Sequence, residues 1–262
     1  MPKIDNVGYG DCTGIKMEHF PRIVAMHLAV TQAVLNKNSY FRQHYRYIDL
    51  TAGKGFSPNG DKGSPIVFLD QAESTKFQIP YRADFIEQES KNINELKEAI
   101  NREKKKNGWV ARDIHFHNNT YQIEIPILLS EKNDKEFGLV FVDPSGELPD
   151  FDCLRYIAKM RPRMEILIYL SSTNVKRTIQ YTGKRLSDYI GNIEKSHWLI
   201  RKAISWDQFK WTFLLGSNAS LFKDYKSINF YQLESQDGQT ILEKLDFTKK
   251  ERVEAKQYKM DI

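Results

Sequence analysis

The sequence predicts an α/β protein with a doubly wound, mostly parallel sheet that ends in an antiparallel hairpin at its edge. Short apolar segments alternate with helical segments along most of the chain, which is the pattern of βαβ units. The segments 137–146 and 165–173 each contain a strand that is apolar on both faces, as buried parallel strands are. Near the C-terminus, two strand-like segments lie close together, as an antiparallel edge pair does.

The chain of 262 residues is long enough to form one large domain with its own core. We expect a single domain over 1–262, with an N-terminal helical segment at 1–44, a ligand-binding core at 45–175 and a C-terminal part at 176–262. Hydrophobic residues make up 40% of the chain and charged residues 28%, which is typical of soluble globular proteins.

Charge and cysteine content narrow the classes of partner. The net charge of +5 suits a nucleic-acid partner but does not require one. Cys12 and Cys153 predict neither a disulfide framework nor a zinc site, so a reduced, cytoplasmic setting is expected. No apolar run is long enough to cross a membrane, and no leader-like segment opens the sequence.

The first half of the chain alternates helices and strands. Apolar residues in 17–36 recur every three or four positions, which predicts a helix against the main domain with Pro21 near its start. Ser64 followed by Pro65 is typical of an N-cap and a first helical residue. The predicted strands of this half are 45–50, 82–88 and 112–118, and the further predicted helices are 65–72 and 90–107, with Ser90 as the cap of the last.

The second half continues this alternation and then changes. Between the two fully apolar strands, 150–162 is predicted to be a crossover helix. The segment 174–186 is interpreted as a basic loop. The strands 210–218 and 227–235 are expected to pair with each other, and a polar helix is expected at 246–262.

The first strand ends in the motif YIDLTAGKG, residues 47–55. In an open parallel sheet, ligands bind beyond the carboxyl ends of the strands. Gly53 and Gly55 lie where the backbone must approach a ligand closely, and Thr51 and Ala52, in the same turn, are predicted to bind it with them. Asp49 would either orient this turn or accept a hydrogen bond from the ammonium group of a ligand.

Three nucleotide-binding patterns are separated by their spacing. A P-loop fails because Asp61 stands where the pattern Gly55–Gly60 requires a lysine. A dinucleotide-binding turn is weak because Pro58 stands where a third glycine is needed. The pattern D-x-x-x-G-x-G, the adenosylmethionine-binding turn of Rossmann-like methyltransferases, matches at Asp49, Gly53 and Gly55, although a tight turn without a ligand remains an alternative.

Two further acids follow neighbouring strands. Glu87 ends the second strand, where a carboxylate can accept hydrogen bonds from both ribose hydroxyls. Asp143 ends the fourth strand and is followed by Pro144, which cannot continue a central strand. Since all three motifs lie at carboxyl ends of strands, their combination favours a binding site over three ordinary strand ends.

These motifs together resemble those of the three-Cys-motif partner (TcmP-like) family of methyltransferases. The resemblance rests on YIDLTAGKG, GSPIVFL at 63–69, FIEQESKNINELKE and FVDPSG, and it covers roughly 17–175. It implies a Rossmann-like class I methyltransferase fold that binds S-adenosylmethionine through Asp49, Gly53 and Gly55, with the ribose near Glu87. It also implies that Asn118 or Asn119 lies near the adenine and that Asp143 lies beside the reactive end.

The Asp-Pro element is similar to the D-P-P-Y loop of methyltransferases that act on amino groups of nucleic-acid bases. In those enzymes the aspartate and a proline carbonyl accept hydrogen bonds from the target amine, and an aromatic ring stacks on the base. The resemblance therefore implies a catalytic role for Asp143, Pro144 and Ser145. Ser145 and Gly146 replace the second proline and the aromatic residue, so a ring that stacks on the base would have to come from elsewhere. Tyr169 is a candidate replacement for the stacking ring, although a core position is the simpler interpretation.

The basic segment suggests how a nucleic acid, DNA or RNA, would bind. Lys176, Arg177, Lys184 and Arg185 surround Tyr181, as expected for residues that contact phosphates, although a solvated charged loop has the same composition. No metal site is expected, because His115 and His117 share one face of a strand without a third ligand and are interpreted as surface residues.

Three functions are therefore consistent with the sequence. The preferred one is an S-adenosylmethionine-dependent methyltransferase that modifies an amino group of a nucleic-acid base. A binding module of the same fold that no longer catalyses, and a small-molecule methyltransferase, are the alternatives. The chain leaves little length for a separate target-recognition domain, so selectivity would come from the C-terminal third or from a partner subunit.

Overall fold

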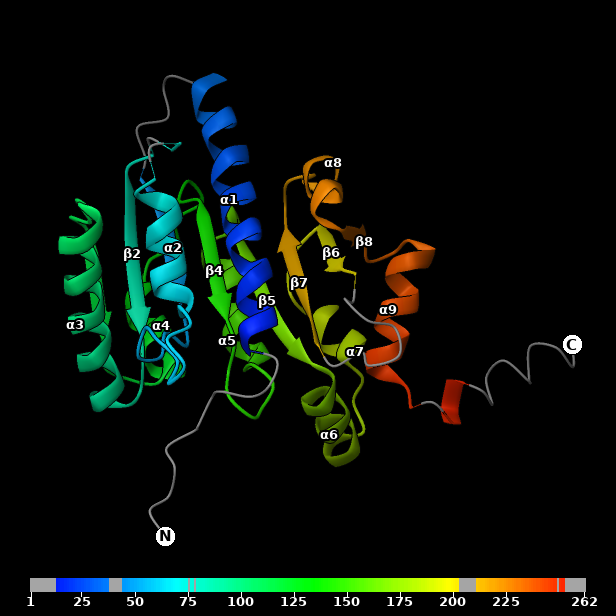
Figure 1. Ribbon diagram of the computed structural model, residues 1–262. Coiled ribbons are helices and arrows are strands. Elements are labelled where there is room, and N and C mark those ends of the chain that lie inside the picture. Colours follow the sequence, from blue (N-terminus) through cyan, green and yellow to red (C-terminus); the bar gives the residue numbers. More distant parts are fainter. Residues whose placement is uncertain are drawn as a thin grey trace, which may run out of the picture.

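The structure is a computed structural model that describes residues 13–37, 44–74, 76–77, 79–202, 211–248 and 250–252, without the side chains of 13–18. Its described strands form one eight-stranded sheet in the order β3-β2-β1-β4-β5-β7-β6-β8 (Figure 1). The strands are β1 (Tyr45–Asp49), β2 (Tyr81–Ile86), β3 (Ile114–His117), β4 (Gly138–Val142), β5 (Met164–Ser171), β6 (His197–Arg201), β7 (Trp211–Ser217) and β8 (Phe230–Gln232). The helices are α1 (Thr13–Lys37), α2 (Ser64–Ala72), α3 (Ser90–Asn107), α4 (Tyr121–Leu128), α5 (Phe151–Met160), α6 (Ser172–Thr182), α7 (Leu186–Ile190), α8 (Phe222–Tyr225), the 3-10 turn Lys226–Ile228 and α9 (Gln236–Asp246).

The predicted fold class is confirmed. Strands β3, β2, β1, β4 and β5 run parallel, and β7 joins β5 in the antiparallel sense. The expected pairing of the two C-terminal strands with each other is wrong, because β6 lies between β7 and β8 and pairs with both. Strand β6 was not predicted, because its five residues, HWLIR, form a short segment without a regular alternation of apolar and polar positions.

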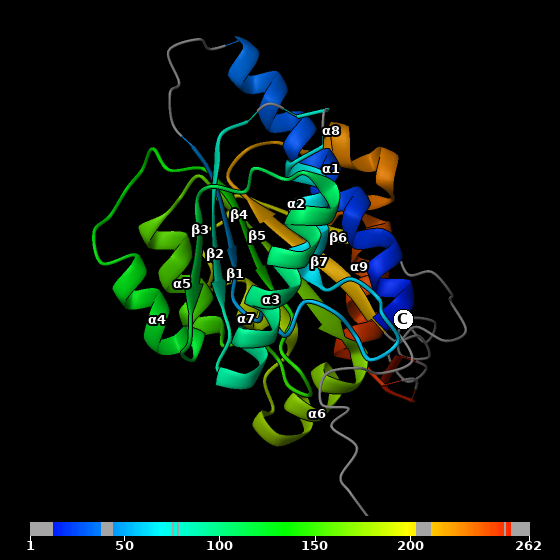
Figure 2. The same ribbon diagram turned by 60° about the vertical axis from the view of Figure 1, so that its left-hand side comes forward.

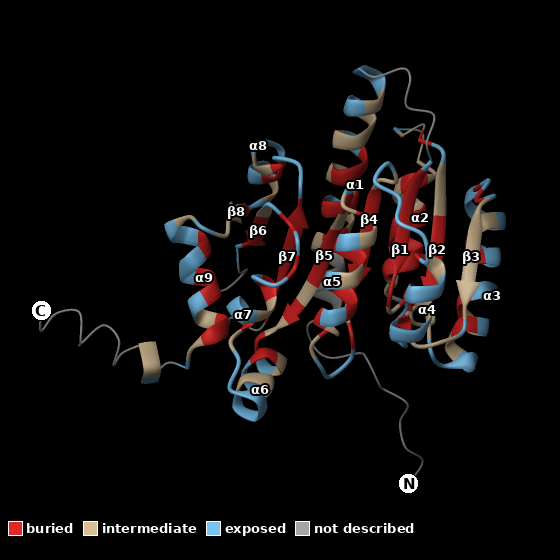
Figure 3. Cartoon of the chain, turned by 180° about the vertical axis from the view of Figure 1, so that it is seen from behind, coloured by how far each residue is buried: buried red, intermediate tan, exposed pale blue. Residues whose placement is uncertain are grey.

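Helices cover both faces of the sheet (Figure 2). Side chains of α1, α2 and α3 pack on one face, and side chains of α4, α5, α6, α7 and α9 pack on the other. Along β1 the side chains alternate between the two layers, since Tyr47 belongs to the first and Ile48 to the second. The central strands β1 and β4 are buried, the edge strand β3 is half-buried, and the outer faces of the helices are exposed (Figure 3). This double cover explains why the central strands are apolar on both faces.

Several predicted helix boundaries differ from the structure. Helix α1 begins at Thr13, so Pro21 lies inside the helix and not near its start. The N-cap of α2 is Gly63 and not Ser64, whose hydroxyl group instead hydrogen-bonds to Asp49. The N-cap of α3 is likewise Glu89 and not Ser90. Ser64 and Ser90, which resembled caps, are instead the first residues of their helices.

The C-terminal third contains more helix than the sequence predicted. The segment interpreted as a basic loop contains α6 and the start of α7, because Val175 and Leu186 are buried against the sheet and fix the helices there. Helix α9 ends at Asp246, where the predicted C-terminal helix was expected to begin. Of that predicted helix, 250–252 are helical and 253–262 lie outside the described residues.

Candidate functional site

A cavity of about 630 Å³ lies at the carboxyl ends of β1, β2 and β4, which are adjacent in the sheet. The loop 54–63, the start of α3 and the start of α4 contribute the rest of its wall. This is the edge of an open parallel sheet at which ligands bind. Strand order therefore brings together the three motifs predicted to form a binding site.

Asp49 is fully buried behind the turn and does not line the cavity. Its carboxylate accepts hydrogen bonds from the Thr51 amide at 3.2 Å, from the Tyr47 hydroxyl at 3.2 Å and from Ser64. Burial raises the pKa of Asp49 to about 7, although these hydrogen bonds oppose the shift. Of the two roles considered for Asp49, this geometry is that of a residue that orients the turn.

The raised pKa of Asp49 gives a testable dependence of stability on pH. Between pH 4 and 7 the folded protein binds more protons at this site than the unfolded chain, so stability falls as pH rises through that window. The shift corresponds to about 4 kcal/mol at most. Asp49→Asn is expected to flatten this part of the profile, measured by thermal denaturation at pH 4 to 8. The exposed Asp224→Asn serves as control, and identical slopes for Asp49→Asn and wild type would contradict the prediction.

Gly53 and Glu87 form a direct link between the ends of β1 and β2. The Gly53 amide donates to Glu87 Oε2 at 2.9 Å, and both residues line the cavity. Glu87 Oε1 accepts from the Glu89 amide at 2.9 Å, so the carboxylate is fixed from two sides. Gly53 has φ of +64°, and a Cβ atom there would meet no protein atom within 4 Å. The turn therefore presents an open backbone and an oriented carboxylate to the cavity.

Ala52 and Gly55, also predicted to bind the cofactor, lie behind this surface. The Ala52 amide donates to the Ile86 carbonyl at 2.9 Å, and its side chain is buried. Gly55 has φ of +88°, and a Cβ atom would lie 3.0 Å from Leu96. The glycine at position 55 is thus required for packing of the turn against α3. Gly55 does not line the cavity.

The turn also contacts the end of β4. The Asp143 amide donates to Thr51 Oγ1 at 2.9 Å, which fixes the Asp-Pro element against the first strand. Thr51, Asp143, Pro144 and Ser145 all line the cavity. The structure therefore brings the predicted catalytic residues to the same cavity as Gly53 and Glu87.

The two asparagines after β3 have different positions. Asn118 donates to the carbonyls of Glu87 and Gln88 at 3.0 and 2.9 Å, which fixes the neighbouring loop, but it does not line the cavity. Asn119 lines the cavity together with Thr120 and Tyr121. Helix α4, which begins at Tyr121, was not predicted because Pro126 lies inside it and resembles a helix breaker.

The cavity wall carries more negative than positive charge. Its charged residues are the acids Asp61, Glu87, Glu89, Glu95, Asp143 and Glu147 and the lysines Lys54, Lys62 and Lys91. Most of these charged residues were not predicted to belong to the site, because the loop 54–63 and the first turn of α3 resemble ordinary solvated segments. Only the strand order places them around one cavity.

The predicted nucleic-acid-binding residues separate into two groups. Lys176, Arg177 and Lys184 are exposed, and Arg177 Nη1 donates to the Gly146 carbonyl at 3.3 Å, beside the Asp-Pro element. Arg185 instead donates to Glu251 Oε1 at 2.9 Å and lies 4.3 Å from the centre of the Phe247 ring. Its guanidinium group thus also fastens the C-terminal segment to the domain.

Tyr169 lies in an aromatic cluster of the core. Its ring centre is 5.7 Å from that of Trp211 and 5.8 Å from that of Phe213. The tyrosine packs against the hydrophobic layer on the α1 side of the sheet. This is the simpler of the two interpretations that the sequence allowed.

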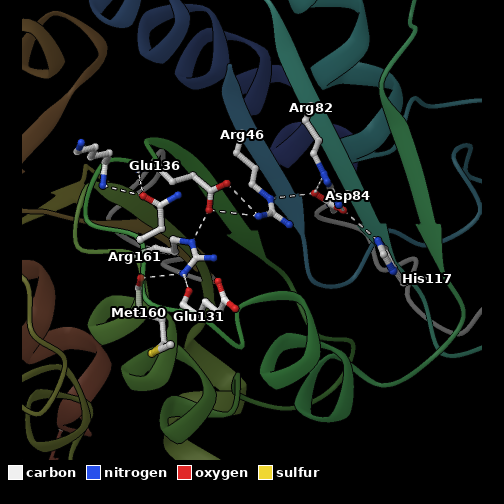
Figure 4. A network of polar contacts seen from close by, with 10 residues as sticks. Arg46, Arg82, Asp84, His117, Glu131, Glu136, Met160 and Arg161 are labelled. Atoms are coloured by element: carbon white, nitrogen blue, oxygen red, sulfur yellow. Dashed lines mark hydrogen bonds and ion pairs between the residues drawn. The ribbon is translucent and has the colours of Figure 1, made fainter. Parts of the chain in front are cut away.

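A network of ion pairs joins side chains of β1, β2 and β3 (Figure 4). Asp84 is fully buried and accepts from Arg46 at 3.0 Å and from Arg82 at 3.0 Å. His117 is 16% exposed and lies between Asp84 and Glu124, so its interpretation as a surface residue is wrong. The described residues contain no group of three histidine, cysteine, aspartate or glutamate side chains that could hold a metal ion.

Comparisons with known proteins identify the fold. No protein-family model matches the chain, and no curated protein matches its sequence. The protein LPL1258 from Legionella pneumophila has a TM-score of 0.52 and 13% identity, covering 78% of this chain and 88% of that one. An O-methyltransferase from Bacillus cereus, crystallised with SAH, has a TM-score of 0.52 and 9% identity, covering 81% of this chain and 84% of that one.

At these identities the similarity establishes the fold. The protein has a Rossmann-like α/β fold, shared with the Bacillus cereus O-methyltransferase, with three antiparallel strands, β7, β6 and β8, at one edge of its sheet. Its resemblance to the three-Cys-motif partner family stays a prediction from the motifs. No helix in the described part of the chain has the length and apolarity needed to span a membrane.

Proposed function

We propose that the protein is an S-adenosylmethionine-dependent methyltransferase that acts in the cytoplasm and modifies an amino group of a nucleic-acid base. The observation that carries the proposal is the cavity in which Gly53, Glu87 and Asp143 meet at the carboxyl edge of the sheet. The Bacillus cereus protein of the same fold was crystallised with SAH, the demethylated form of this cofactor.

The residues of the cavity fit adenosylmethionine. Glu87 would accept hydrogen bonds from the ribose hydroxyls, since its carboxylate is already oriented by the Gly53 and Glu89 amides. Asn119 and Tyr121 would bound the adenine side. The predominantly acidic wall favours a molecule with a net positive charge, which adenosylmethionine carries through its sulfonium group.

The chain's own residues would act mainly by positioning. Bound adenosylmethionine supplies an electrophilic methyl group, and the transfer needs neither a metal nor a covalent enzyme intermediate. Asp143 and the Pro144 carbonyl would accept hydrogen bonds from the acceptor amine and align it for attack. The hydrogen bond from the Asp143 amide to Thr51 couples this alignment to the turn that holds the cofactor.

The first test is cofactor binding by calorimetry. Glu87→Ala is expected to weaken adenosylmethionine binding about 100-fold, because it removes the acceptor for the ribose and leaves the Gly53 amide without its partner. Glu95→Ala removes the same charge from the same cavity wall and is expected to cost less than about fivefold. Equal losses in the two variants would show that charge alone, and not the Glu87 geometry, holds the ligand.

The second test concerns the nucleic-acid partner. Arg177 lies against the Asp-Pro element, and Lys176, Lys184 and the 83% exposed Tyr181 extend the surface beside it. Replacing Lys176, Arg177 and Lys184 together with Ala is expected to weaken DNA or RNA binding and to lower the salt slope by about two to three. The matched control replaces Lys104, Lys105 and Lys106 on α3, and an unchanged salt slope in the α6 variant would remove the nucleic-acid part of the proposal.

A transfer assay separates the enzyme from its alternatives. Tritium from labelled adenosylmethionine is expected in DNA or RNA when both are offered with protein and small molecules. Label in small molecules alone would favour the small-molecule enzyme, and cofactor binding without any transfer would favour a binding module. Selectivity for the target is proposed to come from the C-terminal third or from a partner subunit.

A further inference from the structure

Both ring nitrogens of His117 face carboxylates. Nε2 lies 3.0 Å from Asp84 Oδ1, and Nδ1 lies 2.9 Å from Glu124 Oε1. A neutral imidazole carries one N–H group, so it can donate to only one of these oxygens. The two contacts together therefore require the doubly protonated, positively charged ring.

The two carboxylates contact His117 from different elements, and Figure 4 shows the contact with Asp84. Asp84 belongs to β2 and is fixed by Arg46 and Arg82, which makes it a rigid anchor. Glu124 belongs to the first turn of α4 and is 15% exposed. The charged ring thus links the short helix α4 to strand β2, next to the edge strand β3 of the sheet.

Glu124 continues the chain of contacts to the cavity. Asn119 Nδ2 lies 3.5 Å from Glu124 Oε2, and Asn119 Oδ1 accepts from the Thr120 amide at 2.9 Å. Asn119 and Thr120 line the cavity on the side proposed for the adenine. The contacts therefore run from the buried anchor at Asp84 through His117 and Glu124 to the wall of the candidate site.

We propose that His117 is a positioning residue whose charged ring holds Glu124, and through it Asn119, in the geometry that binds the adenine end of the cofactor. This inference rests on the proposed function, since the ligand in question is adenosylmethionine. It assigns to the protein a cofactor affinity that depends on the protonation of a residue outside the cavity.

The direction of the pH effect follows from the surroundings of the ring. The hydrogen bond to Asp84 raises the pKa of His117, burial lowers it, and the charges of Asp84 and Glu124 raise it further, so that the net shift is upward. In the described residues, Asp84 from β2 and Glu124 from α4 are the charged groups that face the ring, with Arg82 and Arg46 on the far side of Asp84. Affinity should therefore be highest while the ring is charged and should fall as pH rises through this pKa.

The test measures adenosylmethionine dissociation constants by calorimetry from pH 6.5 to 9.5. The measurement uses a double-mutant cycle, which compares the effects of His117→Gln and Glu124→Gln with the effect of both changes together. From pH 6.5 to 9.5, the dissociation constant of wild type is expected to rise about tenfold more than that of Glu124→Gln. The reason is that only wild type has a charge contact between His117 and Glu124 to lose. The coupling between positions 117 and 124 in adenosylmethionine binding is expected to be about tenfold at pH 6.5 and to be smaller at pH 9.5.

His115→Gln is the matched control. His115 lies on the same face of β3, contacts Asp113 at 2.6 Å and is 42% exposed, and no contact with α4 is described for it. It is expected to keep the wild-type pH profile. Glu124→Gln changes only the carboxylate on the short helix, so it carries the test if His117→Gln unfolds on thermal denaturation.

Two results would overturn the inference separately from the proposed function. One is that the dissociation constants of wild type and Glu124→Gln change in parallel with pH. The other is a coupling between positions 117 and 124 that is the same at both ends of the pH range. Either result would show that His117 has only a structural role. If wild type binds no adenosylmethionine at any pH, the proposed function fails and the inference falls with it.

Discussion

Asp143→Ala is expected to lower the rate of methyl transfer about a thousandfold while adenosylmethionine still binds. A residue that aligns and polarises an acceptor amine contributes about 10² to 10⁴ to the rate. The hydrogen bond from residue 143 to Thr51 uses the backbone amide, so the turn keeps this contact after the substitution. The loss should therefore appear in kcat and not in the cofactor dissociation constant.

Single-turnover kinetics and calorimetry together check this prediction. Glu147→Ala is the matched control, because it removes a carboxylate from the same loop and the same cavity wall. It is expected to retain transfer within about fivefold of wild type. A rate for Asp143→Ala within tenfold of wild type would exclude a role for this carboxylate in aligning the acceptor.

Asp84→Ala is expected to destabilise the fold by about 3 to 5 kcal/mol, the loss typical of breaking a buried ion pair. The substitution leaves Arg46, which is 6% exposed, without one of its two acidic partners. It also removes the anchor of His117. Urea denaturation at pH 7 measures the change in unfolding free energy.

The control for Asp84 is an exposed ion pair. Asp134 contacts Lys132 at 3.2 Å and is 64% exposed, so Asp134→Ala is expected to cost less than about 1 kcal/mol. Burial opposes the ionisation of Asp84, but His117, Arg82 and Arg46 outweigh it and hold its pKa well below the ordinary value. Its contribution is therefore present at neutral pH and lost only in strong acid. A loss below 1 kcal/mol for Asp84→Ala would contradict a stabilising role for the network.

Much of the parallel half of the sheet could be predicted from the sequence. Continuous apolar runs such as those of β4 and β5 occur where helices cover both faces, so their pattern is unambiguous. Motifs at strand ends were also predictable, since all carboxyl ends of parallel strands meet at one edge. The cavity confirms that Gly53, Glu87 and Asp143 lie together.

The remaining features depend on contacts that local patterns do not encode. Gly55 resembled a ligand-binding glycine, but its position is explained by Leu96 of α3. The pairing of His117 with Asp84 and Glu124 joins three elements and follows from strand register and the docking of α4. Similarly, the stretch 172–182 is too polar to resemble a helix until one side of it packs on the sheet.

The position of β7 between β5 and β6 has a consequence for synthesis of the chain. Strand β5 is complete at Ser171, but its neighbour ends at Ser217. A nascent chain that has reached Ser171 therefore presents an unsatisfied row of amides and carbonyls along β5, a template for wrong partners. About 45 further residues must leave the ribosome before β7 can close that edge, so in this interval β5 is open to pairing with other chains.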